Sequence, residues 1–170
     1  IILATANGMA ICFNENDVRP MGRDAAGVRG ILLTGDDYVI GAEKAEEGTT
    51  LLTVTVNGYG KRTDVDEYRI TGRNCKGIIT HNINELTGNI VDMAAVTGEE
   101  DIMLITNDGV IIRTKINQIR TMGRSTQGVR VMRVQEGVKV VAIAVAPKED
   151  EEAVEINENG EATVQEAETN

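Results

Sequence analysis

Arginines that recur at a fixed spacing are the residues of this chain best suited to do chemistry. The pattern Arg-x-x-Gly-Arg occurs three times, at residues 19–23, 69–73 and 120–124. Each guanidinium is permanently charged and carries several N–H donors, so it binds phosphate oxygens well. A positive charge repeated at fixed spacing matches a partner whose negative charge is also repeated. Nucleic acid is the obvious partner of that kind.

The arginine pattern is part of a longer internal repeat that is marked by glycines. The glycines of Asn7-Gly8, Asn57-Gly58 and Asp108-Gly109 each lie 14 residues before the glycine of an Arg-x-x-Gly-Arg pattern. A further glycine follows that one after five residues, at 27, 77 and 128. The period is therefore 50 and then 51 residues. Self-similarity at such a period indicates a stack or ring of equivalent units.

Each repeat is predicted to contain four short β-strands. An apolar run (1–5, 51–55 and 102–106) leads through Asn-Gly or Asp-Gly into a second run, which predicts a hairpin with a type I′ turn. We expect a third strand after the next glycine, at 27–33 and 128–134, and a fourth at 38–42, 90–96 and 138–145. With no helical periodicity, this predicts an all-β, propeller-like array of four-stranded blades.

The repeats divide the chain into three blades and a tail. We expect blades at about 1–50, 51–101 and 102–146, followed by a segment at 147–170 with nine acidic residues and one lysine. The net charge of −10 is concentrated there, and the segment is expected to be disordered, whereas the body is close to neutral. Three blades form only a partial disc. Together with the missing initiator methionine, this leads us to expect a piece of a longer protein.

Other chemistry has little support in the sequence. Cys12, Cys75 and His81 lack the paired spacing of a disulfide or zinc framework, so we expect free thiols and a solvated or strand-edge histidine. No set of residues is spaced for acid–base or nucleophilic catalysis, and we expect no enzymatic activity from this chain alone. No apolar run is long enough to span a membrane, and no signal peptide is present.

Three segments resemble a known family. Residues 57–63 (NGYGKRT, followed by Glu67-Tyr68), 103–109 (MLITNDG) and 122–130 (MGRSTQGVR) are similar to the C-terminal DNA-wrapping domain of DNA gyrase A. The resemblance covers residues 1–146. It implies a β-pinwheel of six blades that exchange strands, with these three as the last. The glutamine-arginine-glycine-rich box that this family normally carries in its first blade is absent here.

The resemblance also implies a function. Duplex DNA bends around a basic outer rim, and gyrase, a type IIA topoisomerase assembled as A2B2 from gyrase A and gyrase B, then introduces negative supercoils. The catalytic tyrosine and the ATP and Mg sites belong to regions that this chain lacks, so no cofactor is expected here. The expected location is the bacterial cytoplasm, at the nucleoid.

The expected contact is with the phosphate backbone and reads little sequence. The four aromatic residues are too few for a stacking platform, and no helix pattern suits a major groove. The candidate DNA-binding residues are Arg19, Arg23, Arg29, Lys61, Arg62, Arg69, Arg73, Lys76, Arg113, Lys115, Arg120, Arg124, Arg130 and Arg133.

Alternatives remain open for single residues and for the whole chain. Any one arginine can instead cap loop carbonyls or pair with Asp64, Asp66 or Glu67. The whole chain can instead be the corresponding domain of topoisomerase IV, or a propeller that scaffolds protein partners.

Overall fold

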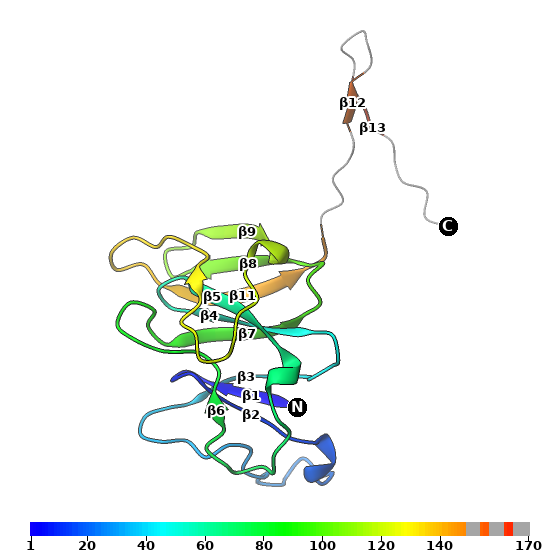
Figure 1. Ribbon diagram of the computed structural model, residues 1–170, viewed down its shortest axis with the longest axis vertical. Coiled ribbons are helices and arrows are strands. Elements are labelled where there is room, and N and C mark those ends of the chain that lie inside the picture. Colours follow the sequence, from blue (N-terminus) through cyan, green and yellow to red (C-terminus); the bar gives the residue numbers. More distant parts are fainter. Residues whose placement is uncertain (149–153, 157–161, 165–170) are drawn as a thin grey trace.

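Three antiparallel sheets lie one above another in the body of the molecule (Figure 1). The computed structural model describes residues 1–148, 154–156 and 162–164. The first sheet has the order β3-β1-β2-β6, the second β10-β5-β4-β7 and the third β11-β8-β9. The strands are β1 (Ile2–Thr5), β2 (Met9–Cys12), β3 (Val39–Glu43), β4 (Thr50–Thr55), β5 (Tyr59–Asp64), β6 (Ile78–Ile79), β7 (Ile90–Val96), β8 (Asp101–Thr106), β9 (Ile111–Lys115), β10 (Val129–Arg130) and β11 (Val140–Ala146). The prediction of three repeated β-units is confirmed.

The hairpin that opens each repeat is present, but its turn is not of type I′. In all three turns only the glycine has positive φ, for example Gly58 at 76°, while the asparagine or aspartate before it does not. The amide of Gly58 donates to the carbonyl of Thr55 at 3.0 Å, which is the bond of a turn that ends in a left-handed residue. The Thr55 hydroxyl also accepts the amide of Tyr59 at 3.2 Å. The left-handed glycine forms a β-bulge, which leaves the amide of the next residue without a partner on the facing strand. The threonine hydroxyl accepts from that amide in all three repeats, as Thr5, Thr55 and Thr106.

Neighbouring repeats exchange a strand. β6 belongs to the second repeat but pairs with β2 of the first, and β10 of the third repeat pairs with β5 of the second. The registers are equivalent, since Ala10 faces Ile78 and Gly60 faces Val129. Each of the first two sheets is therefore completed by the repeat that follows it, as the resemblance implies.

The predicted third strand is much shorter than expected. Of residues 128–134 only Val129 and Arg130 form a strand, because the amides of Val131 and Met132 both turn to the carbonyl of Gly58. Residues 27–33 form no strand, and Ile31 makes a single bridge to Cys75. These residues correspond to β6 and β10, which pair with a preceding repeat; no repeat precedes them among the described residues.

Apolar side chains hold the sheets together. Leu52 and Val54 of β4 pack with Ile102 and Leu104 of β8 in one cluster. A second cluster joins Ile2 of β1 to residues of the second repeat. All five side chains are fully buried. Successive side chains of β4 point to opposite faces of the second sheet, so Leu51 packs in the cluster with the first sheet, and Leu52 packs in the cluster with the third.

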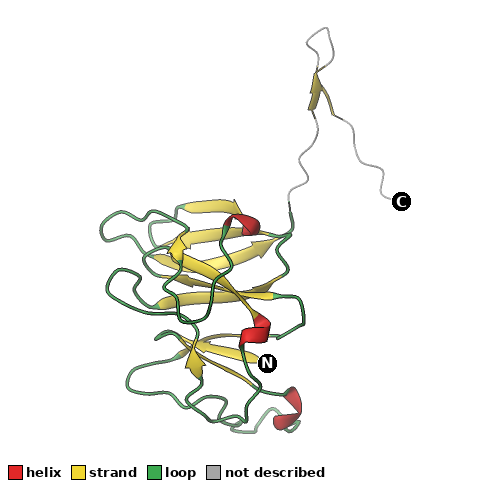
Figure 2. Ribbon diagram, in the orientation of Figure 1, coloured by secondary structure: helices red, strands yellow, loops and turns green. Residues whose placement is uncertain are grey.

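The remaining regular structure is limited (Figure 2). Three short 3-10 helices, η1 (Glu15–Asp17), η2 (Val65–Glu67) and η3 (Ile116–Gln118), follow the hairpins. None of the helices described here has the length and hydropathy that crossing a membrane requires. In the segment where disorder is expected, β12 (Val154–Ile156) and β13 (Ala162–Val164) pair as antiparallel strands. The other residues from 149 onward lie outside the described part, so the expectation of disorder for 147–170 stays a prediction.

Candidate functional site

The first arginine of each Arg-x-x-Gly-Arg pattern is exposed. Arg19, Arg69 and Arg120 are solvent-accessible and occupy equivalent places in the three repeats. Among the described residues, none of these three guanidiniums has a hydrogen bond or ion pair. They carry recurring positive charge that is available to a partner.

The second arginine of the pattern joins adjacent repeats instead. Arg73 donates from Nε to the carbonyl of Asp17 at 2.9 Å and from Nη1 to that of Arg29 at 2.8 Å. One repeat later, Arg124 Nη1 donates to the carbonyl of Ile79 at 2.9 Å. The structural alternative of capping loop carbonyls therefore applies to both arginines. The corresponding Arg23 is exposed.

Arg124 also meets a carboxylate of the preceding repeat. Its backbone amide donates to Glu67 Oε2 at 3.1 Å, and its Nε lies 3.8 Å from the same oxygen. The pairing with Glu67 that the sequence left open is thus present. The guanidinium of Arg124 is therefore held within the protein by one hydrogen bond, to Ile79, and one ion pair, to Glu67, and its buried Nε has no hydrogen-bond partner among the described residues.

Lys61 is a correction to the predicted DNA-binding set. Its side chain is completely buried, and Nζ donates to the carbonyls of Gly123 at 2.8 Å and Arg124 at 2.5 Å and to Thr126 Oγ1 at 3.1 Å. An ammonium has three donors, so all are used. Burial lowers the pKa of Lys61 to about 8, while the nearby Glu67 acts in the opposite direction. Lys61 is inaccessible to a phosphate.

His81 is also buried, contrary to the expectation of a solvated or strand-edge histidine. Nε2 lies 2.9 Å from the carbonyl of Gln127, which can only accept, so Nε2 carries the proton. Nδ1 then accepts from Thr53 Oγ1 at 3.0 Å. Burial, and secondly the charge of Lys61, lower the pKa of His81 to about 4, so the ring is neutral at pH 7.

The other predicted cations differ in accessibility. Arg62 is half-buried, and its Nε donates to the carbonyl of Ile119 at 2.8 Å. Arg130 stacks on the ring of Tyr59 at 5.4 Å and bonds its hydroxyl, while Arg113 pairs with Asp101 at 2.8 Å. Lys115 is half-buried. The exposed members of the set are Arg19, Arg23, Arg29, Arg69, Lys76, Arg113, Arg120, Arg130 and Arg133.

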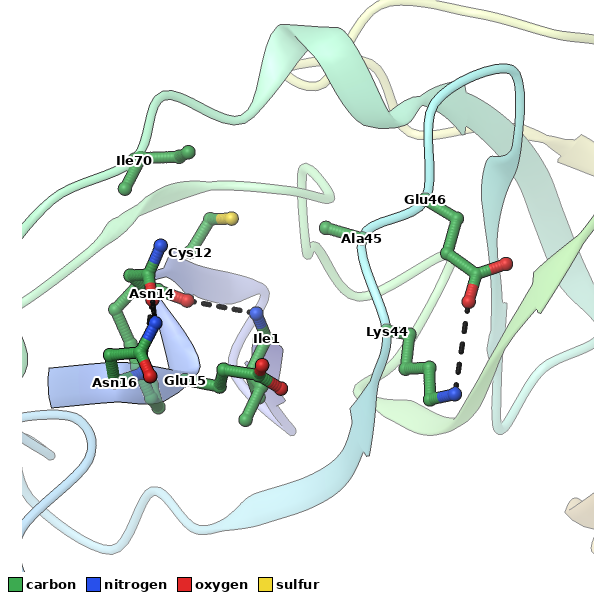
Figure 3. Close-up of a pocket in the computed structure, with 10 residues that line it drawn as sticks. Ile1, Cys12, Asn14, Glu15, Asn16, Lys44, Ala45, Glu46 and Ile70 are labelled. Carbon is green, nitrogen blue, oxygen red and sulfur yellow. Dashed lines mark hydrogen bonds and ion pairs between the residues drawn. The ribbon is translucent and has the colours of Figure 1, made fainter. Parts of the chain in front are cut away.

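The lining of one surface cavity and the positions of possible metal ligands bear on other chemistry. A cavity of about 420 Å³ lies in the first repeat, and Figure 3 shows its polar groups bonded to one another, with Lys44 and Glu46 on one side and Asn14 and Asn16 on the other. Across the part of the chain that the structure describes, no three His, Cys, Asp or Glu side chains gather as metal ligands would. Cys12 and Cys75 are free thiols, as predicted.

Comparisons with known proteins identify the same three repeats. The family model "DNA gyrase C-terminal domain, beta-propeller" matches residues 1–46, 49–97 and 100–147. The DNA gyrase A protein of Staphylococcus epidermidis (strain ATCC 12228) is 48% identical over 89% of this chain, and that of Staphylococcus aureus (strain MRSA252) is 45% identical over 98%. The chain spans only 17% and 19% of the length of these two relatives.

Solved structures give the same result. A structure of the DNA gyrase A C-terminal domain superposes with a TM-score of 0.80 at 27% identity, covering 85% of this chain and 50% of that one. The C-terminal domain of DNA topoisomerase IV has the same fold, with a TM-score of 0.80 at 24% identity over 86% of this chain and 46% of that one. Since the family model matches all three repeats, the chain belongs to the DNA gyrase C-terminal domain family of β-propellers.

Proposed function

We propose that this chain binds duplex DNA through its phosphates and wraps it, as part of a bacterial gyrase in which gyrase A and gyrase B act together as A2B2. The observation that supports this best is the exposure of Arg19, Arg69 and Arg120 at one register of all three repeats. Equivalent units present equivalent charges to a polymer whose charge is itself periodic. The chain contributes no catalytic group, and supercoiling belongs to the complete enzyme at the nucleoid.

The contact is with the backbone rather than with base edges. No α-helix occurs in the described residues to enter a major groove. The buried Tyr59 and Tyr68 are inaccessible for base stacking. Any sequence preference then comes from the ease with which the DNA bends.

A salt titration tests the proposal. A triple variant, Arg19→Ala, Arg69→Ala and Arg120→Ala, is compared with the exposed control Lys44→Ala. The log K versus log salt slope for a duplex should fall in magnitude by about 3 in the triple variant, equally for unrelated sequences. A slope that stays at the value of the Lys44→Ala control would overturn the proposal. Weak salt dependence of the parent chain would favour the protein-scaffolding alternative.

A further inference from the structure

The loop 119–127 of the third repeat is held on the second sheet by side chains of the second repeat. Besides the bonds from Lys61 and His81, Arg62 Nε donates to the carbonyl of Ile119 and Thr63 Oγ1 donates to that of Met122 at 3.0 Å. Four side chains therefore fix carbonyls from the beginning to the end of the loop. Between its fixed ends the loop carries the exposed Arg120.

In the corresponding loop 68–76 on the first sheet, no described carbonyl accepts a bond from a side chain of the first repeat, and the loop's own Arg73 donates to carbonyls of that repeat instead. The residues equivalent to Lys61, Arg62, Thr63 and His81, which lie 50 positions earlier, are Ile11, Cys12, Phe13 and Ile31. All four are apolar or nearly so, and all are buried. The hydrogen-bonding groups that the described residues of the preceding repeat contribute to this loop are backbone groups, such as the carbonyl of Cys12 that accepts from the amide of Thr71 at 2.8 Å.

The first junction also contains a cavity. A cavity of about 100 Å³ lies between the repeats and is lined by residues that include Ile11, Cys12 and Cys75. Cys75 holds the place that Thr126 holds in the third repeat, where Thr126 accepts a bond from Lys61. The two junctions share a backbone plan and differ in side-chain chemistry.

Packing alone does not account for Lys61. Isoleucine fills the same register in the other two repeats, as Ile11 and Ile112. A buried ammonium carries a large desolvation cost, and well-packed apolar residues in place of buried charges are often as stable or more so. What the cation and the histidine supply is a defined position for the loop carbonyls that they bind.

We propose that Lys61 and His81 are positioning residues for DNA binding, which hold loop 119–127 in one conformation so that Arg120 meets its phosphate in place. This inference rests on the proposed function. The loop that carries Arg69 lacks these attachments and is held instead by Arg73 and by backbone bonds, so it keeps more freedom before the duplex binds. A loop ordered in advance avoids the entropy cost of ordering at the moment of association.

The test grafts the chemistry of the first junction onto the second, with Lys61→Ile and His81→Ile. Amide hydrogen exchange without DNA should speed up at least tenfold in residues 119–127, while the amides of β1 and β2 keep their protection. If the double variant does not fold, Lys61→Met, which keeps the length of the side chain and removes the charge, takes its place.

DNA affinity supplies the readout that a merely structural role would not move. At fixed salt the duplex should bind three- to tenfold more weakly, with an unchanged salt slope, because the phosphate contacts remain and only their ordering becomes costly. Unchanged affinity despite faster exchange would overturn the inference, as would unchanged exchange. A slope reduced by about 1 would mean that the substituted lysine itself met a phosphate.

Arg120→Ala separates this inference from the proposed function. In the parent chain it should reduce the salt slope by about 1, and in the double variant its effect on affinity at fixed salt should be smaller. If Arg120→Ala has no effect in the parent chain, DNA binding at this loop is wrong. If its effect is the same in both backgrounds, only the positioning role fails.

Discussion

Arg124 reaches back into the preceding repeat and donates from Nη1 to the carbonyl oxygen of Ile79 at 2.9 Å. Arg73 makes the equivalent bond to Arg29, which lies 50 residues before Ile79. In the second and third repeats, the second arginine of the pattern thus links its repeat to the preceding one by hydrogen bonds, whereas the first arginine is solvent-exposed. One short motif combines two roles, and mutation separates them.

Arg124→Ala should destabilise the fold, whereas Arg120→Ala should not. Arg124→Ala removes a charged donor from the carbonyl of Ile79 and a neighbour of Glu67, so the free energy of unfolding should fall by about 2 kcal/mol. The guanidinium of Arg120 has no partner among the described residues, and the carbonyl that accepts from the amide of Arg62 remains after replacement, so stability should change by less than about 0.5 kcal/mol. Urea denaturation of both variants measures the difference. Equal stability of the two variants would contradict the division of roles.

Gly77→Ala and Gly27→Ala compare two glycines with nearly the same φ, 75° and 76°. A Cβ at Gly77 would lie 2.2 Å from the carbonyl oxygen of Ala10, while a Cβ at Gly27 meets nothing within 4 Å. Gly27→Ala should therefore cost only the left-handed strain, about 1 kcal/mol. Gly77→Ala should cost about 3 kcal/mol or more, because β2 and β6 must also move apart.

Thermal or chemical denaturation of the two glycine variants checks this prediction. The backbone strain of a left-handed alanine is common to both variants. Any difference in their loss of stability therefore comes from the close approach of the first and second repeats at Gly77. Equal losses would show that the strands separate at Gly77 without cost.

His81 should make the fold sensitive to mild acid. Its pKa is lowered from 6.5 to about 4, so the unfolded chain binds the proton more readily between these values. The stability that a neutral His81 contributes is therefore fully present above pH 6.5 and is lost as pH falls towards 4. The loss should be roughly 3 kcal/mol at most.

Denaturant melts at several pH values measure this loss, with His81→Ile as the comparison. The variant retains every carboxylate of the parent chain, so subtracting its pH profile isolates the histidine. If the free energies of unfolding of the parent chain and of His81→Ile differ by the same amount from pH 7 to pH 4, the lowered pKa of His81 is wrong.

The acidic segment should weaken DNA binding at low salt. Truncation after Lys148 removes nine carboxylates and keeps the bond from Arg113 Nη2 to the carbonyl of Pro147. A tethered anionic segment competes with phosphates at high local concentration, most strongly where screening is weak. The truncated chain should bind duplex several-fold more tightly at low salt, with the gap closing as salt rises.

A full-length chain with those nine carboxylates replaced by amides is the matched control. It should bind like the truncated chain, because the effect belongs to the charge. If the amide chain instead binds like the parent, the acidic charge has no part in the effect.

The repeat and its strands could be predicted because their signals are local. The glycines that the turns require and the apolar runs recur at one spacing, so Gly8, Gly58 and Gly109 mark three hairpins. The turn type was wrong, since Asn-Gly also suits a turn in which only the glycine is left-handed. The short third strand was missed because its length depends on the repeat with which it pairs, and that pairing is not local.

The roles of the cations could be predicted only in part. An arginine's sequence neighbours do not reveal whether a carbonyl of another repeat lies within its reach. Arg23 and Arg73 hold the same place in the pattern, yet Arg23 is exposed while Arg73 donates to two carbonyls of the preceding repeat. A signal for Lys61 and His81 was present, however. In an alignment of the repeats on one another, both are polar where Ile11 and Ile31 stand, which marks them as exceptions.

Strand donation by β6 and β10 has a consequence for how the chain acquires its structure during synthesis. The first sheet begins at Ile2 but is not complete until Ile79 is available, and the second waits in the same way for Arg130. Each unit emerges from the ribosome with an open edge that its successor must close. Closing each edge brings together residues far apart in sequence, which slows folding. Assembly therefore proceeds from the first repeat to the last. Until the next repeat is synthesised, the open edge of β2 or β5 can pair with another nascent chain.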